Sequence, residues 1–262
     1  MDFAILFAVT ILAGFIGSIM GLGGGIIMVP LFTIVFALPI KMAVGTSLVA
    51  IIINSAASSV IYLERGEVSL PAALRLQTFT VIGATAGGVA AGFFPARLIA
   101  YLFSVVLLWT AYQMAYKALR VAKSEIGGDV SHGNQDWDFY GLGRKLRLWA
   151  YGGSVFAGMI SSLLGVGGGV IQVPLIHLLL KAPIRISIAT SAFMIGITAS
   201  AGAAHYVLRG DINPLTAVVV ATSIFVGAHV GATIAPKIRL TYIRVGFSAV
   251  LIYTAIRMFI QG

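Results

Sequence analysis

The stretch GLGGG, residues 21–25, interrupts a long apolar part of the chain: FAILFAVTILAGFIGSIM (3–20) precedes it and IIMVPLFTIVFALP (26–39) follows it. A membrane-spanning helix gains nothing from these glycines, because each costs about 1 kcal/mol of helix stability relative to alanine. A second stretch, GVGGG at residues 165–169, breaks another apolar part in the same way. Two such breaks in one chain need a common explanation.

The composition predicts an all-α integral membrane protein. The 262 residues are 59% hydrophobic and only 10% charged, with a mean hydropathy of +1.02, whereas soluble domains carry about 25% charged residues. Several apolar runs approach the roughly 20 residues that a helix needs to cross a bilayer, which argues against a barrel of short strands. The 17 basic residues lie mainly between these runs, which disfavours a nucleic-acid partner. The expected partners are the lipid bilayer and a small molecule.

The chain is an internal duplication. Residues 14–68 align without a gap to residues 158–212, with 21 identities in 55 positions. The sequence therefore predicts a first transmembrane repeat at 1–119, a solvated linker at 120–147 and a second repeat at 148–262. In each repeat the apolar runs suggest a helix, a glycine break, a short helix and three further spans. The expected runs are 3–20, 26–38, 43–62, 70–94 and 97–119 in the first repeat, and 148–164, 170–180, 186–206, 214–235 and 240–260 in the second.

The short second run of each repeat leaves two geometries: one broken crossing, or a hairpin whose limbs enter and leave on the same side. Positive charge decides between them, because cytoplasmic loops are enriched in lysine and arginine. With the linker in the cytoplasm, the hairpin places 13 of the 17 basic residues inside, and the broken crossing places 10 inside. We therefore expect hairpins, two inverted-topology repeats and a cytoplasmic linker, in a multi-pass protein of the cell (inner) membrane. The N-terminal MDFAIL has no basic region before its apolar run and is interpreted as a retained segment rather than a signal peptide.

The glycine breaks suggest an anion site. Each precedes a short helix, and helix N-termini offer unpaired N–H groups and partial positive charge to an anion. Close helix packing is the alternative explanation, and it is the preferred one for Gly83, Gly87, Gly88, Gly227 and Gly231. The hydroxyls near the next helices are expected either to cap those helices or to donate to the oxyanion. The predicted substrate-binding residues are Gly21, Gly23, Gly24, Gly25, Thr46, Ser47, Asn54, Gly165, Gly167, Gly168, Gly169, Gln172, Thr190 and Ser191.

Three histidines in apolar runs of the second repeat, His177, His205 and His229, have no histidine at the equivalent first-repeat positions. They are candidates for proton coupling, since imidazole titrates near neutral pH; neutral hydrogen bonding between helices is the other interpretation. The pairs Arg65-Gly66 and Arg209-Gly210 predict turns with local pairing to the following acidic residue. The sequence lacks a nucleophile–base cluster, a metal-ligand cluster, cysteine and a phosphate-binding GxxxxGK[ST] motif. We therefore expect neither an enzyme nor a cofactor.

The paired motif GxxxxxxGxGGGxxxxP, at 14–30 and 158–174, together with the later Thr-Ser pairs, resembles the TauE/SafE family of membrane transporters over nearly the whole chain. The resemblance implies transport of sulfite, sulfonates or related organosulfur anions. From the residues themselves only a small-anion carrier follows. We expect a secondary transporter that works by alternating access, coupled to protons or to sodium; an anion channel or a small-carboxylate transporter is the alternative. The sequence leaves the particular anion, its direction of movement and the oligomeric state open.

Overall fold

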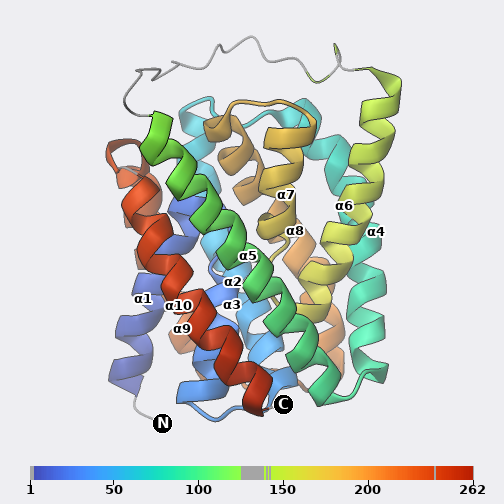
Figure 1. Ribbon diagram of the computed structural model, residues 1–262. Coiled ribbons are helices and arrows are strands. Elements are labelled where there is room, and N and C mark those ends of the chain that lie inside the picture. Colours follow the sequence, from blue (N-terminus) through green and yellow to red (C-terminus); the bar gives the residue numbers. More distant parts are fainter. Residues whose placement is uncertain (1–2, 125–138, 140, 142, 239, 262) are drawn as a thin grey trace.

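The protein is an all-helical bundle in a computed structural model that describes residues 3–124, 139, 141, 143–238 and 240–261 (Figure 1). Within these residues there is no β-strand. The helices of the first half are α1 (Phe3–Met20), α2 (Gly25–Pro30), η1 (Leu31–Val35), α3 (Ile40–Glu64), α4 (Leu70–Phe93) and α5 (Ala96–Ser124). Those of the second half are α6 (Arg144–Leu164), α7 (Gly169–Pro174), η2 (Leu175–Leu179), α8 (Ile184–Leu208), α9 (Pro214–Ile234), η3 (Ala235–Lys237) and α10 (Leu240–Gln261).

These helices match the runs expected from the sequence, with differences at their ends. The largest is at the linker, because α5 continues to Ser124 and α6 begins at Arg144. Most of the remaining linker, including the polar stretches at 127–129 and 131–134, lies outside the described residues. Five of the described helices, α3, α4, α5, α8 and α9, are long and apolar enough to cross a membrane.

Each glycine break turns the chain back on itself. Gly21, Gly23 and Gly24 have φ values of +66°, +73° and +80°, a left-handed conformation that side chains other than glycine rarely adopt. A Cβ on Gly24 would lie 3.2 Å from the Ala13 carbonyl oxygen, so the start of α2 lies beside the middle of α1. Gly168 likewise lies beside Ala157, and the Leu175 side chain reaches back to Gly153. Both halves therefore contain the predicted hairpin rather than a single broken crossing.

The short return limb changes from α-helix to π-helix at a proline in both halves. α2 ends at Pro30 and η1 follows; α7 ends at Pro174 and η2 follows. Proline has no N–H and its ring crowds the preceding turn, so a regular α-helix does not continue through it without adjustment. A wider π turn provides that adjustment. Each limb then ends in a residue other than glycine with positive φ, Ala37 at 51° and Lys181 at 56°.

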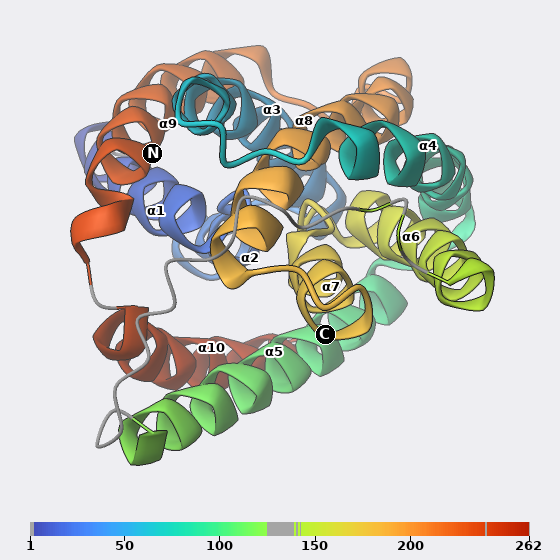
Figure 2. The same cartoon turned by 90° about the horizontal axis from the view of Figure 1, so that it is seen from above.

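The two halves interlock rather than standing side by side. α1 packs along α9, and α6 packs along α4, while α3 and α8 cross the centre together. α3 and α8 run antiparallel, because Gly45 lies against Tyr206 whereas Ser55 bonds to the Ala192 carbonyl. Figure 2 shows α5 and α10 as a separate pair beside this core. Tyr101 and Phe259 touch at the start of α5 and the end of α10, so this pair is antiparallel too.

Small residues allow the close helix contacts. A Cβ on Gly83 would overlap the Val155 carbonyl, and one on Gly227 would overlap the Ile11 carbonyl. Helices of the other half also crowd Gly87 and Gly231, and at Gly88 a Cβ would lie 3.0 Å from the His205 and Ser162 side chains. The packing interpretation of these five glycines is confirmed.

The ends of the bundle differ in which segments they hold (Figure 1). The end of α5 and the start of α6 lie at one end, which we name the linker end. The start of α1 and the end of α10 lie at the other, which we name the terminal end. The α9–α10 connection is also at the linker end, whereas the α5 start is at the terminal end.

Candidate functional site

The two glycine breaks meet at the centre of the bundle. A Cβ on Gly25 would overlap the Gly165 carbonyl oxygen, and a Cβ on Gly169 would overlap the Gly21 carbonyl oxygen. The contacts are reciprocal: each break supplies one carbonyl and one crowded glycine. In this conformation the breaks touch directly, so no ligand fits between Gly25 and Gly165. Gly23 and Gly167 both have positive φ and lie between the side chains of Ile51 and Ile195.

Serine hydroxyls on α3 and α8 each donate a hydrogen bond to the glycine break of the other half. Ser47 Oγ on α3 donates to the Gly165 carbonyl at 2.9 Å, and Ser191 Oγ on α8 donates to the Gly21 carbonyl at 3.2 Å. The capping interpretation of these residues is wrong, because α3 and α8 begin earlier than expected, at Ile40 and Ile184, after uncapped prolines. The hydroxyls therefore lie two turns into their helices and face the breaks.

The equivalent threonines differ between the halves. Thr190 Oγ1 accepts the Ser69 N–H at 3.0 Å. Thr46 Oγ1 is buried without a hydrogen-bond partner. A buried hydroxyl with no partner costs free energy, so Thr46 is a candidate contact for a bound polar group.

Backbone donors remain unused at both breaks. The N–H groups of Gly21 and Leu22 donate to α1 carbonyls, and those of Ile27 and Met28 donate to the Gly24 carbonyl. In the described structure, the N–H groups of Gly25 and Ile26 donate to no backbone carbonyl, and the same is true of Gly169 and Val170. These are the free donors expected in the first turn of a helix.

Two buried amides stand beside the breaks with unsatisfied atoms. Asn54 on α3 is 1% exposed, and neither its Nδ2 nor its Oδ1 has a partner. Its Nδ2 lies close to Gly17 and Gly24. Gln172 on α7 is also 1% exposed; its Nε2 donates to Thr80 Oγ1 at 3.4 Å, and its Oε1 has no partner. Buried amides normally have hydrogen-bond partners, so we expect both to bond to a ligand, to a water or within a second conformation.

Two buried polar residues of α4 were not among the predicted site residues: Thr80, which bonds to Gln172, and Gln77, one turn away. Gln77 and Thr80 on α4 are buried, and the Gln77 amide lies 3.1 Å from the hydroxyl of Thr198, the counterpart of Asn54. Gln77 is a single amide within an apolar run, and that is the signal that could have identified it. No signal in the sequence brings α4 to the break of the other half, because the two segments are far apart along the chain.

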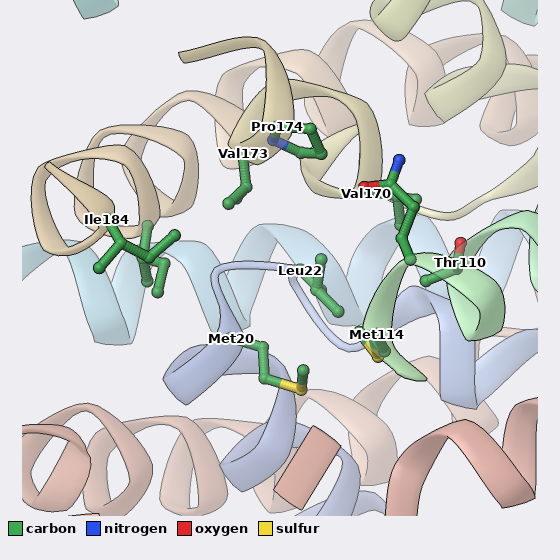
Figure 3. Close-up of a pocket in the computed structure, with 10 residues that line it drawn as sticks. Met20, Leu22, Thr110, Met114, Val170, Val173, Pro174 and Ile184 are labelled. Atoms are coloured by element: carbon green, nitrogen blue, oxygen red, sulfur yellow. The ribbon is translucent and has the colours of Figure 1, made fainter. Parts of the chain in front are cut away.

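A cavity of about 60 Å³, which we name the central cavity, adjoins both breaks (Figure 3). Leu22 belongs to the first break, Met20 directly precedes it, and Val170 directly follows the second break. The wall completed by α5 was not expected, and it contributes Thr110, Gln113 and Met114. Val173, Pro174, Ile184 and Ile188 form the remainder. This cavity is large enough for a few water molecules, since each needs about 10–15 Å³, and its lining is mostly apolar.

The three histidines are not brought together. His177 Nδ1 lies 2.8 Å from the Ala182 carbonyl oxygen in the turn after η2, and His205 Nδ1 lies 3.1 Å from the Ala201 carbonyl oxygen on its own helix. His229 is exposed and stacks on Phe225. The expectation of hydrogen bonds between helices is therefore wrong for His177 and His205, which bond locally. No group of three or more His, Cys, Asp or Glu side chains suited to a metal occurs among the described residues.

The two Arg-Gly turns differ from the expected local pairing in one half. Arg209 pairs with Asp211 at 3.0 Å, as expected, and also donates to the Gly88 carbonyl. Arg65 donates instead to the carbonyls of Ala232 and Thr233. Each arginine thus ties its central helix to α4 or α9 of the other half, which the sequence could not show.

Comparison with known proteins identifies the family. The model of the family described as "Sulfite exporter TauE/SafE" matches residues 6–258, nearly the whole chain. The chain belongs to the TauE/SafE family. Its helical architecture and its family together establish an integral, multi-pass membrane transporter rather than an enzyme.

Some relatives of this TauE/SafE protein match nearly its full length, and others match about half of it. It is 26% identical to the probable membrane transporter protein YunE of Bacillus subtilis, over 100% of this chain and 99% of the relative. It is also 26% identical to a probable membrane transporter protein of Methanocaldococcus jannaschii, over 95% and 94% of the two chains. Sulfite exporter TauE/SafE family protein 5 of Arabidopsis thaliana is 30% identical over 48% of this chain and 29% of its own. No solved structure matches the protein.

Proposed function

We propose that this TauE/SafE protein is a secondary transporter that moves a small sulfur-containing oxyanion, such as sulfite or a sulfonate, by alternating access. One observation carries the proposal: two glycine breaks from equivalent positions meet at the centre of the bundle, beside buried polar groups without partners. The sulfur oxyanion is supported by the family description. None of the described residues that line the central cavity is acidic, which also favours an anion because a carboxylate there would repel it.

We assign to the anion groups that were predicted from the sequence, and they become available only after the two halves move apart. In the described conformation Ser47 and Ser191 hold the carbonyls of the opposite breaks, and the breaks touch. The free N–H groups, the Asn54 and Gln172 amides and the Thr46 hydroxyl are the donors we assign to the oxyanion. Movement of one half against the other separates the breaks and makes these donors available. Binding by neutral donors avoids placing a permanent positive charge at membrane depth, where it is expensive.

The inverted topology is part of this proposal. The antiparallel packing of the equivalent helices α3 and α8, and of α5 and α10, supports two oppositely oriented repeats. Such repeats commonly hold substrate near the bilayer midplane, at their interface. The positive-inside rule supports a cytoplasmic linker end, in the cell (inner) membrane.

Uptake and binding measurements with purified protein test the transport function. Proteoliposomes would be offered labelled sulfite, sulfate, taurine and sulfoacetate, with carboxylates of similar size as controls. We expect saturable uptake of at least one sulfur oxyanion and a rise in the thermal unfolding midpoint with the same anion. Uptake of carboxylates alone, flux without saturation, or neither uptake nor stabilisation across the whole panel would contradict the proposal.

Coupling to a proton or to sodium is also proposed, and a pH gradient or a sodium gradient imposed across the proteoliposomes tells the two apart. Among the three histidines we assign proton coupling to His205, because its ring lies beside Gly88, close to the unpartnered Ser162 hydroxyl. His205→Gln should abolish stimulation by a pH gradient, whereas His177→Gln and His229→Gln should keep it. Retention of the stimulation in His205→Gln would exclude that assignment.

A further inference from the structure

A second cavity opens near the linker end, close to the central one. It measures about 90 Å³ and lies between the end of α3, the start of α8 and the η3 turn. Tyr62 and Glu67 line it from the first half, and Arg185 lines it from the second. Ile19, Ala235, Pro236 and Ile238 complete the wall. We name it the vestibule.

The vestibule and the central cavity share one wall. Ile188 lines both, and the consecutive residues Ile19 and Met20 line one each. The Ile188 backbone and its Cγ2 also pack against Gly21 of the first break, where a Cβ would lie 2.8 to 3.1 Å from their atoms. One isoleucine side chain and the end of α1 therefore separate the vestibule from the space beside the breaks. Ile188 is 7% exposed.

Arg185 supplies the positive charge of the vestibule. Its side chain is exposed and takes part in no hydrogen bond or ion pair within the described residues. The nearby Tyr62 hydroxyl is already used, because it donates to the Ser18 carbonyl at 2.9 Å. The remaining charged lining residue is Glu67, which forms no ion pair with Arg185 in this part of the chain. Arg185 is thus the unpaired cation among the described lining residues, and the Glu67 carboxylate partly offsets its attraction for an anion.

The equivalent positions in the other half have different surroundings. Val44 is the counterpart of Ile188; it packs against Gly165 and is 0% exposed. Lys41, the counterpart of Arg185, donates to the Gly92 carbonyl at 3.3 Å. Asp211, the counterpart of Glu67, pairs with Arg209. The surroundings of Ile188 and Val44 therefore differ, and a separate cavity of about 300 Å³ at the terminal end, lined by Thr33, Leu38, Ile40, Ala96, Arg97, Ala100 and Met258, does not include Val44.

We propose that the vestibule is the anion entrance of this conformation, with Arg185 recruiting small anions at the linker end and Ile188 forming the inner partition before the breaks. The inference rests on the proposed anion transport for its biological meaning, but its geometry is independent of which anion is carried. A cation at the mouth of a low-dielectric cleft raises the local concentration of small anions and speeds their association.

The absence of cysteine from the chain allows a direct test by single-cysteine labelling. Ile188→Cys and its matched control Val44→Cys would be treated with an anionic, membrane-impermeant methanethiosulfonate reagent, and with a cationic reagent of similar size. We expect Ile188→Cys to react roughly tenfold faster than Val44→Cys, and faster with the anionic reagent. Equal rates at the two positions, or no reaction at Ile188→Cys, would overturn the entrance.

The role of Arg185 is tested in the same cysteine background. Arg185→Gln should remove the preference of Ile188→Cys for the anionic reagent, Arg185→Lys should keep it, and the matched Lys41→Gln should leave it unchanged. A preference that survives Arg185→Gln would refute the recruiting role. The labelling needs no transport, so a clear anion preference without uptake of any tested sulfur anion would leave the entrance standing and remove the proposed function. Uptake of a sulfur anion without any preference for the anionic reagent would leave the proposed function standing and overturn the entrance.

Discussion

At the scale of single residues, glycine is required at the breaks for two separate reasons. Gly21, Gly24, Gly165 and Gly168 have positive φ, and Gly25 and Gly169 lie against the carbonyls of the opposite break. Gly21 and Gly165 meet both demands, because Ile188 and Ser47 crowd their Cβ positions. The sequence shows the glycines but not this division, because only tertiary contact distinguishes a turning glycine from a crowded one.

Gly25→Ala should destabilise the protein by about 1–3 kcal/mol, because the added methyl group overlaps the Gly165 carbonyl in a packed core. The measurement is the midpoint of thermal unfolding in detergent. Gly152→Ala is the control, since nothing lies within 4 Å of its Cβ position inside α6. There the substitution should stabilise the helix by about 0.5–1 kcal/mol. Equal responses at both positions would contradict the contact between the breaks.

Asn54→Leu should separate stability from transport. Leucine has the same branching as asparagine and removes two unsatisfied buried atoms, so the unfolding midpoint should stay the same or rise. Transport of the identified anion should fall at least about tenfold if the amide contributes one charge-assisted hydrogen bond of roughly 1.5–3 kcal/mol.

The matched control for this prediction is Gln77→Met. The Gln77 amide is bonded to Thr198, so its loss should lower the unfolding midpoint by the equivalent of about 1–3 kcal/mol. A large loss of stability in Asn54→Leu with unchanged transport per folded molecule would assign Asn54 a structural role instead.

At the scale of elements, the return limbs of the hairpins carry local strain at their ends. α2 and α7 each pass through a proline into a π turn, and each limb then ends at a residue in the left-handed region. Sequence periodicity identified both limbs as short helices. It did not identify the π turns, because the proline in each limb predicts a break in the regular α-helix but not the form that the following turn takes.

Ala37→Gly should stabilise the protein by about 1 kcal/mol, because Ala37 has a φ of 51°, which costs a residue with a Cβ about 1–3 kcal/mol. The same substitution at Ala56, an exposed position within α3, should destabilise by about 1 kcal/mol. Thermal unfolding in detergent measures both effects. A lower midpoint for Ala37→Gly would show that the limb does not hold this backbone conformation.

At the scale of the whole molecule, orientation in the membrane follows from which segments share an end. The start of α1 and the end of α10 lie at the terminal end, opposite the end of α5 and the start of α6 (Figure 1). With the linker end in the cytoplasm, reporters fused to either terminus should therefore report an external location. A reporter inserted at Gly133 should report a cytoplasmic one. A cytoplasmic signal from either terminus would overturn the proposed orientation.

The sequence by itself determined the helical membrane fold, the duplication, the glycine breaks and the family motif, because apolar run length, repeat identity and glycine position are written along the chain. Only the tertiary structure decided which glycines touch, which amides lack partners, that α4 and α5 approach the breaks, and that Ile188 borders the vestibule. These features depend on helices far apart in sequence and on the relative position of two similar halves. Equivalent residues such as Ile188 and Val44 can therefore have different surroundings, and no sequence pattern predicts that Ile188 is the one that borders the vestibule.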